Sequence, residues 1–304
     1  NQDLINFYEK GHQKGYGIGL SEFDNIFTTY TKQFIVVTGF PSSGKSDFVY
    51  QMCFWYNMLY GWKTSYASTE NFPAYLHVDK IVRKFYGRKP DSDDVNGIAW
   101  KKTVDYVSRN FFHINYDDGY DFTKILKKGE ELVKRKGIRC LVIDPYNKVR
   151  YKEGKKLSIN DYTNEYLNKI DNFCKKHDVL VVLVAHPTKP EKVDGKLLPP
   201  TFYDVKGGGE FYDMSPHGLL VHRDRTEEGM LNNRVMIKVL KVKFANLGTN
   251  DASTDFAWNV NNGRYESLKD GDPVWDNTNW LTKDNKFKTA QQSLIKLEEL
   301  DNVF

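Results

Sequence analysis

The sequence predicts an α/β fold with a mainly parallel sheet, helices on its flanks and antiparallel strands at its C-terminal end. From Phe34 to about residue 185, short apolar runs alternate with helical patterns, which is typical of parallel strands joined by crossover helices. Beyond residue 215 the apolar runs are joined by turns instead, with Asn261-Asn262-Gly263 as a hairpin signal. Ligands of such sheets bind where the parallel strands end.

The elements follow from these patterns in chain order. Parallel strands are expected at 34–38, 63–68, 111–114, 140–143 and 179–185, with helices at about 45–60, 73–86, 121–136 and 158–177. Apolar side chains of the last helix recur at three-to-four spacing, at Tyr162, Tyr166, Ile170, Phe173 and Cys174. Antiparallel strands are expected at 218–222, 235–244 and 254–260.

Length and composition indicate one main domain. The chain has 304 residues, 40% of them hydrophobic, and its 44 basic and 40 acidic residues give a net charge of +4, a balance that neither requires nor excludes nucleic acid. We expect an N-terminal linker at 1–30, a nucleotide-binding domain at 31–266 and a C-terminal tail at 267–304 with a short helix near 290–300. Because the chain starts at Asn1 rather than Met, it leaves room for an upstream domain.

The cysteines and the apolar segments indicate the cellular compartment of the protein. Cys53, Cys140 and Cys174 stand singly in apolar surroundings, which favours buried thiols in a reducing compartment over a zinc site. No membrane span or signal peptide is recognisable. We therefore expect a soluble, cytoplasmic protein.

A glycine-rich run stands between the first strand and the first helix, and reads Gly39-Phe40-Pro41-Ser42-Ser43-Gly44-Lys45-Ser46. In that context it is a phosphate-binding P-loop. Its backbone N–H groups would surround the phosphates, Lys45 would reach the β- and γ-phosphates, and Ser46 would ligate Mg²⁺. The sequence predicts binding of ATP or another nucleoside triphosphate with Mg²⁺, through Gly39, Ser42, Ser43, Gly44, Lys45 and Ser46.

Two carboxylates follow buried strands at the same expected edge of the sheet. Asp144 ends the run Cys140-Leu141-Val142-Ile143, which suits a metal-organising acid beside Lys45, although a strand-end Asp before Pro145 is also common. Glu70 follows the strand at 63–68 and could position the attacking water, or could be a surface turn residue.

A histidine and two basic stretches follow the other strands. His186 ends the strand at 179–185 and is a candidate sensor of the γ-phosphate. Basic stretches after the strands at 140–143 and 179–185 would form flexible loops suited to a phosphodiester strand, although charge runs are often only solvated surface. The residues expected to bind DNA are Lys148, Arg150, Lys189, Lys206, Gly207, Gly208 and Gly209.

Together these motifs resemble the helicase domain of the DnaB-type superfamily (superfamily 4), hexameric RecA-fold replicative helicases, and most of all phage primase-helicases and the Twinkle type. The resemblance covers about residues 16–265. Besides the P-loop it depends on Ser68-Thr69-Glu70-Asn71, Val142-Ile143-Asp144, Ala185-His186-Pro187, Asp204-Val205-Lys206-Gly207-Gly208-Gly209 and Leu240-Lys241-Val242-Lys243-Phe244.

The resemblance implies a RecA-like P-loop NTPase core that works as an ATP-dependent DNA helicase in replication. It implies a hexameric ring on single-stranded DNA, 5′ to 3′ movement, a primase domain or polymerase as partner, and a bacterial or phage-infected cell. By the same resemblance Arg223 and Trp258 would flank the adenine. Lys241 and Lys243 would act across the subunit interface.

One departure from the family keeps alternatives open. Where the family has an arginine that reaches the neighbouring subunit's γ-phosphate, this chain has Lys243, a point charge without a bidentate fork. Hydrolysis could be slow, or Arg225 or Arg234 could substitute. The alternatives are a RecA-fold ATPase that remodels a protein or filament, and a low-turnover nucleotide-binding module that assists assembly or loading.

Overall fold

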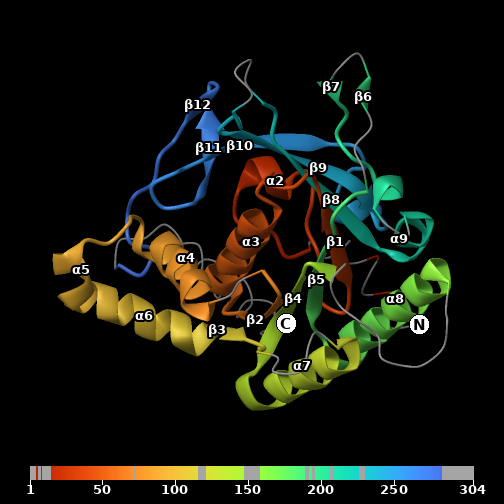
Figure 1. The fold of residues 1–304 in the computed structure, drawn as a ribbon, viewed down its shortest axis with the longest axis horizontal. Coiled ribbons are helices and arrows are strands. Elements are labelled where there is room, and N and C mark those ends of the chain that lie inside the picture. Colours follow the sequence, from red (N-terminus) through yellow and green to blue (C-terminus); the bar gives the residue numbers. More distant parts are fainter. Residues whose placement is uncertain are drawn as a thin grey trace.

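The computed structural model describes residues 5, 8, 15–70, 73–115, 121–146, 158–188, 192–193, 196–205, 208–225 and 230–282. Within them, a ten-stranded sheet lies between two helical layers, with the strand order β12-β11-β10-β9-β8-β1-β5-β4-β2-β3 (Figure 1). The predicted α/β class is confirmed.

Six neighbouring strands are parallel, from β8 to β3. Nearly all their residues are buried because helices cover both faces, and this explains why they appear in the sequence as continuous apolar runs. Their bounds are β1 (Phe34–Thr38), β2 (Lys63–Ser68), β3 (Phe111–His113), β4 (Ile138–Asp144), β5 (Leu180–Val184) and β8 (His217–His222).

The remaining strands of this sheet form the antiparallel extension that the turn signals predict. They are β9 (Arg234–Val242), β10 (Ser253–Trp258), β11 (Tyr265–Lys269) and β12 (Asp272–Pro273), each paired with the one before it. The hairpin between β10 and β11 turns at Asn261-Asn262-Gly263, where Gly263 has φ +73°.

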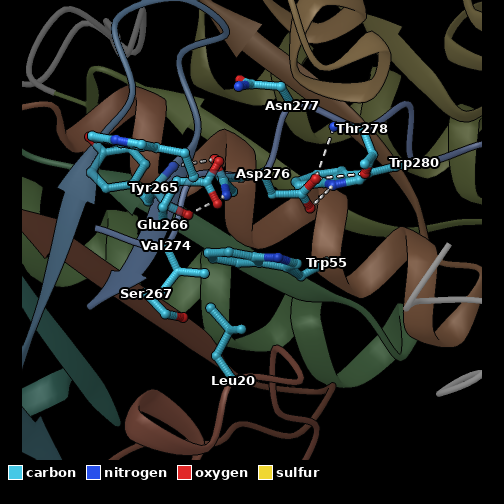
Figure 2. A pocket seen from close by; sticks show the side chains of 12 residues that line it. Leu20, Trp55, Tyr265, Glu266, Ser267, Val274, Asp276, Asn277, Thr278 and Trp280 are labelled. Atoms are coloured by element: carbon cyan, nitrogen blue, oxygen red, sulfur yellow. Dashed lines mark hydrogen bonds between the residues drawn. The ribbon is translucent and has the colours of Figure 1, made fainter. Parts of the chain in front are cut away.

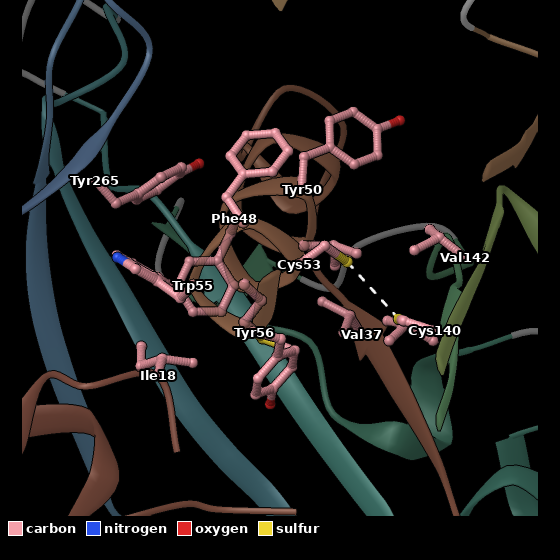
Figure 3. Close-up of a cluster of buried hydrophobic side chains, with 14 of the residues drawn as sticks. Ile18, Val37, Phe48, Tyr50, Cys53, Trp55, Tyr56, Cys140, Val142 and Tyr265 are labelled. Atoms are coloured by element: carbon pink, nitrogen blue, oxygen red, sulfur yellow. Dashed lines mark hydrogen bonds between the residues drawn. The ribbon is translucent and has the colours of Figure 1, made fainter. Parts of the chain in front are cut away.

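The two helical layers bury alternate residues of each strand. In β1, Ile35 and Val37 face a cluster that includes α3 (Lys45–Tyr60), α4 (Ala74–Tyr86) and α6 (Ile98–Asn110), whereas Phe34 and Val36 face α7 (Phe122–Lys136) and α8 (Ile159–His177). Figure 3 shows the first cluster around α3, with the Sγ atoms of Cys53 and Cys140 3.8 Å apart. The three cysteines are free and buried, as predicted.

The shorter elements lie outside the predicted pattern, and the first of them, α2 (Ser21–Asp24), falls within the segment expected to be a linker. The sequence prediction missed α5 (Ser92–Asn96) and α6, of which only Thr103 and Val107 are fully buried. It also missed β6 (Lys192–Val193), β7 (Lys196–Leu197), the 3₁₀ turns η2 (Phe202–Asp204) and η3 (Ala245–Leu247), and α9 (Gly208–Met214). Among the described helices, none combines the length and apolarity that a bilayer span requires.

Residues beyond the expected boundary at 266 pack on the same core. That boundary falls inside β11, and Trp280, 1% exposed, donates its backbone N–H to Phe85 O (2.9 Å). The buried Arg264 guanidinium lies 3.9 Å from the Trp280 ring centroid and donates to the carbonyl oxygens of Lys84 and Thr278, each at 2.7 Å. A cavity of about 380 Å³ lies between this segment, β11 and Trp55 of α3 (Figure 2). The helix expected near 290–300 lies outside the described residues.

Candidate active site

The P-loop has the backbone that its glycines permit. Gly39 (φ +151°) packs so closely on β8 that a Cβ there would collide with the carbonyl oxygen of Val221. Ser42 has φ +63°, which is uncommon outside glycine, and Gly44 (φ +93°) is the N-cap of α3. Because glycine has no capping side chain, the first N–H groups of α3 are available to a phosphate. The buried Ser43 Oγ has no hydrogen-bond partner among the described residues, which also fits a bound phosphate.

Lys45 is held inside this loop. Its side chain is buried, and Nζ donates to Phe40 O at 2.8 Å. Burial lowers the pKa of Lys45 to about 8, while the nearby charges of Asp144 and Glu70 act to raise it. Lys45 is therefore mainly charged at neutral pH and lies within electrostatic reach of both carboxylates.

Asp144 lies buried at the end of β4, with its two carboxylate oxygens in different surroundings. Oδ2 accepts a 2.8 Å hydrogen bond from the Tyr50 hydroxyl, whereas Oδ1 has no hydrogen-bond partner in the described part of the chain. Burial raises the pKa of Asp144, and the hydroxyls of Ser46 and Tyr50 act against that rise. A buried carboxylate oxygen left open beside a serine hydroxyl fits the hard oxygen ligands that Mg²⁺ prefers.

Glu70 and His186 meet at the same edge of the sheet. Glu70 follows β2 and His186 follows β5, and His186 Nε2 lies 3.8 Å from Glu70 Oε1. The neighbouring Thr69 donates its backbone N–H to Asp144 O at 3.2 Å. The ends of β1, β2, β4 and β5 thus bring together Lys45, Glu70, Asp144 and His186.

The segment after His186 is tied to the segment at 201–205. Pro187 forms a bridge with Val205, and Thr188 donates to Asp204 O from its backbone N–H (2.6 Å) and from Oγ1 (2.8 Å). The expectation of a flexible loop through residue 209 is wrong in part, because Gly208 and Gly209 begin α9 and η2 precedes them. The predicted DNA-binding residues Lys148, Arg150, Lys189, Lys206 and Gly207 lie outside the described residues.

Lys241 and Lys243 lie away from the P-loop of their own chain. They flank Val242, which pairs with His217 of β8. His217 in turn pairs with Ile35 near the start of β1, whereas the P-loop follows the end of β1. Lys241 Nζ donates to the carbonyl oxygens of Tyr212 and Asp213 at the end of α9. The structure does not bring either lysine to the phosphate site of the same subunit.

The expected adenine-flanking pair is in direct contact. The Arg223 guanidinium lies over the Trp258 ring, 5.2 Å from its centroid, and Arg223 Nε donates to Asn232 O at 2.7 Å. An adenine would have to stack on an outer face of this pair or separate it.

Sequence reasoning missed two tyrosines that support the site. Tyr50 positions Asp144, as described above, and the Tyr265 hydroxyl donates to Gly44 O at 2.7 Å. Gln51 fixes Tyr265 by accepting from its backbone N–H (2.9 Å) and donating to its carbonyl oxygen (3.0 Å). Tyr265 also lines the cavity in Figure 2, so one residue contacts both that cavity and the P-loop. No local motif marks either tyrosine.

Fold and site together define a P-loop nucleotide-binding domain with a RecA-like core. No family model matches the chain. Its sequence is 31% identical over 252 residues to the Twinkle homolog protein, chloroplastic/mitochondrial, of Arabidopsis thaliana, in a match that covers 78% of this chain and 35% of that protein. The chain therefore spans about a third of the length of this relative.

Solved structures agree on the fold. A DnaB-like replicative helicase, whose structure was described with its interactions with primase, matches with a TM-score of 0.70 at 17% identity, over 88% of this chain and 68% of that one. A separately solved ATPase domain matches with a TM-score of 0.69 at 16% identity, over 88% of this chain and 98% of that one. The predicted resemblance to DnaB-type helicase domains is confirmed, and the bacterial or phage setting stays a prediction.

Proposed function

We propose that this chain is the ATPase motor of a ring-forming DNA helicase, which moves along single-stranded DNA and separates duplex strands during replication. The observation that supports this most is the meeting of Glu70 and His186 beside Lys45 and Asp144, combined with the hydrogen bonds from Thr188 to Asp204. A phosphate site is thereby connected to the segment in which DNA contacts are predicted. The match to a Twinkle homolog adds support.

Each residue of the site has a role in binding or hydrolysing the nucleotide. Lys45 would exchange Phe40 O for the phosphate oxygens of ATP. Ser46 and Asp144 would hold Mg²⁺, which when bound supplies positive charge to the phosphate oxygens. Glu70 would orient the attacking water, and His186 would bond the γ-phosphate and register its loss. Arg223 and Trp258 would bind the base.

The site would be completed by a neighbouring subunit. Lys241 and Lys243 lie near the start of β1, whereas their own P-loop follows the end of that strand. They could therefore reach only the nucleotide of another subunit. This fits a closed ring, for which we propose six subunits. Arg234, which is paired with Asp255 at 2.8 Å, and Arg225 are the alternative candidates for this role.

Movement would come from sequential hydrolysis around the ring. Loss of the γ-phosphate at His186 would shift the 187–209 segment, and Lys189, Lys206, Gly207, Gly208 and Gly209 would carry the DNA backbone together with Lys148 and Arg150. We propose 5′ to 3′ polarity and a primase domain or polymerase as partner. The lysine at 243 also favours a second candidate, a low-turnover nucleotide-binding module.

Strand displacement on a forked duplex tests the proposed function. With ATP and Mg²⁺ the protein should release the labelled strand from a fork with a 5′ single-stranded tail on the tracked strand, and Lys45→Ala should release none. ATP turnover without strand release on forks with either tail would contradict the helicase and favour the protein-remodelling alternative. Normal ATP binding with negligible turnover would favour the low-turnover module.

A further inference from the structure

Two tyrosines form an exposed stack that the active site does not use. The rings of Tyr203, in η2, and Tyr212, in α9, have centroids 5.0 Å apart and planes inclined by 22°. Tyr203 is 64% exposed and Tyr212 is 39% exposed. One face of the Tyr203 ring is covered by Tyr212, and its high exposure indicates that the other face is open to solvent.

The backbone that carries Tyr203 is firmly held. The adjacent Phe202 is buried against β8. Its ring lies so close to Gly218 that a Cβ there would collide with it, so the packing of Phe202 requires glycine at position 218. Asp204 accepts hydrogen bonds from the backbone N–H (2.5 Å) and Oγ1 (2.8 Å) of Thr201, closing the turn. A ring presented on such a turn loses little conformational entropy when a ligand stacks on it.

A positive charge lies beside the stack. Lys241 Nζ is 4.9 Å from the centroid of the Tyr212 ring and is held by the carbonyl oxygens of Tyr212 and Asp213. An open aromatic plane suits a nucleotide base, which stacks on the ring, and the cation supports the Tyr212 ring behind it.

We propose that Tyr203, backed by Tyr212, is a stacking platform for a base of single-stranded DNA. This platform rests on the proposed function. It adds a contact with a DNA base, whereas the DNA contacts predicted from the sequence are with the phosphodiester backbone. The stack would tolerate any sequence, since every base offers a π face. Asp204, next to Tyr203, accepts both hydrogen bonds from Thr188, two residues beyond His186, so the platform would move with the nucleotide state.

The test compares two single strands of equal length and charge, one of thymidines and one of abasic sites. Affinities are measured by fluorescence anisotropy with Mg²⁺ and a non-hydrolysable ATP analogue. The wild type should bind the thymidine strand more tightly than the abasic strand. Tyr203→Leu should weaken thymidine binding at least about fivefold, the lower end of the effect of removing a stacking ring, and leave abasic binding unchanged. Tyr203→Phe should behave as the wild type.

A control variant and three contrary results complete the test. Tyr75→Leu removes a tyrosine of similar exposure (68%) from α4 and should change neither affinity. Equal wild-type affinity for the two strands would overturn the platform without reference to any variant, and so would unchanged thymidine binding by Tyr203→Leu. No wild-type affinity for either strand would contradict the proposed function itself.

Discussion

The Tyr50 hydroxyl donates a 2.8 Å hydrogen bond to Oδ2 of Asp144, and both side chains are buried. The bond joins α3, which begins at the P-loop, to the end of β4. This bond occupies one carboxylate oxygen of Asp144, and the other has no hydrogen-bond partner among the described residues. If Asp144 holds Mg²⁺ as we propose, Tyr50 would act on the metal through Asp144, as a positioning residue.

Tyr50→Phe should weaken metal binding about tenfold, since loss of a ligand's supporting hydrogen bond commonly costs 10- to 100-fold in metal affinity. The measurement is titration of Mn²⁺ into the ADP complex, followed by electron paramagnetic resonance. Tyr66→Phe is the matched control, because it removes a hydroxyl from the ring that packs edge-on against Tyr50 at 5.1 Å. Equal Mn²⁺ affinity in the wild type and Tyr50→Phe would contradict the positioning role.

Glu70→Gln should retain ATP affinity and lower the hydrolysis rate at least about 100-fold, the usual contribution of a general base. The amide keeps the shape of the side chain but cannot take up a proton. Equilibrium binding of a fluorescent ATP analogue and steady-state turnover together separate the two effects. Turnover close to that of the wild type would remove Glu70 from the catalytic set.

Lys243→Ala should lower turnover only at protein concentrations where subunits assemble. Mixing it with Glu70→Gln should restore part of the activity, because some sites then combine an intact Glu70 with a neighbour's intact Lys243. Lys243→Arg should raise turnover roughly tenfold, since a guanidinium offers a bidentate fork to the phosphate. Mixed subunits with no more activity than the separate variants would argue against a role across the interface.

The buried histidine pair makes stability depend on pH. His77 Nδ1 lies 3.2 Å from His113 Nδ1, and burial lowers the pKa of His77 to about 2. Below pH 6.5 the unfolded chain binds a proton that the folded chain excludes, so the free energy of unfolding falls as the pH falls.

Urea unfolding at pH 7 and pH 5 measures that dependence. His77→Gln should reduce the loss of stability between these two values by about 2 kcal/mol, given about 1.4 kcal/mol for each pKa unit. His177→Gln is the control, since His177 is much less buried and should have a smaller effect. The same loss in the wild type and His77→Gln would show that His77 is not the group responsible.

The parts of the fold that the sequence predicted correctly depend on local patterns. The P-loop specifies its own turn, and the continuous apolar runs of β1, β4 and β5 follow from helices on both faces. The partner of the Tyr50 hydroxyl is 94 positions away in the sequence, and the partner of the Tyr265 hydroxyl is 221 positions away. Both contacts depend on tertiary packing, which no short motif encodes. The helical start at Gly208 was missed because consecutive glycines favour a loop prediction, whereas packing on η2 and α8 favours a helix here.

We propose that this chain is a motor whose sites are completed by assembly on DNA. The decisive measurement is steady-state ATP hydrolysis across a protein titration, with and without a long single-stranded DNA. The rate per subunit should rise with protein concentration and rise further with DNA. A rate that responds to neither would contradict a ring-dependent DNA motor.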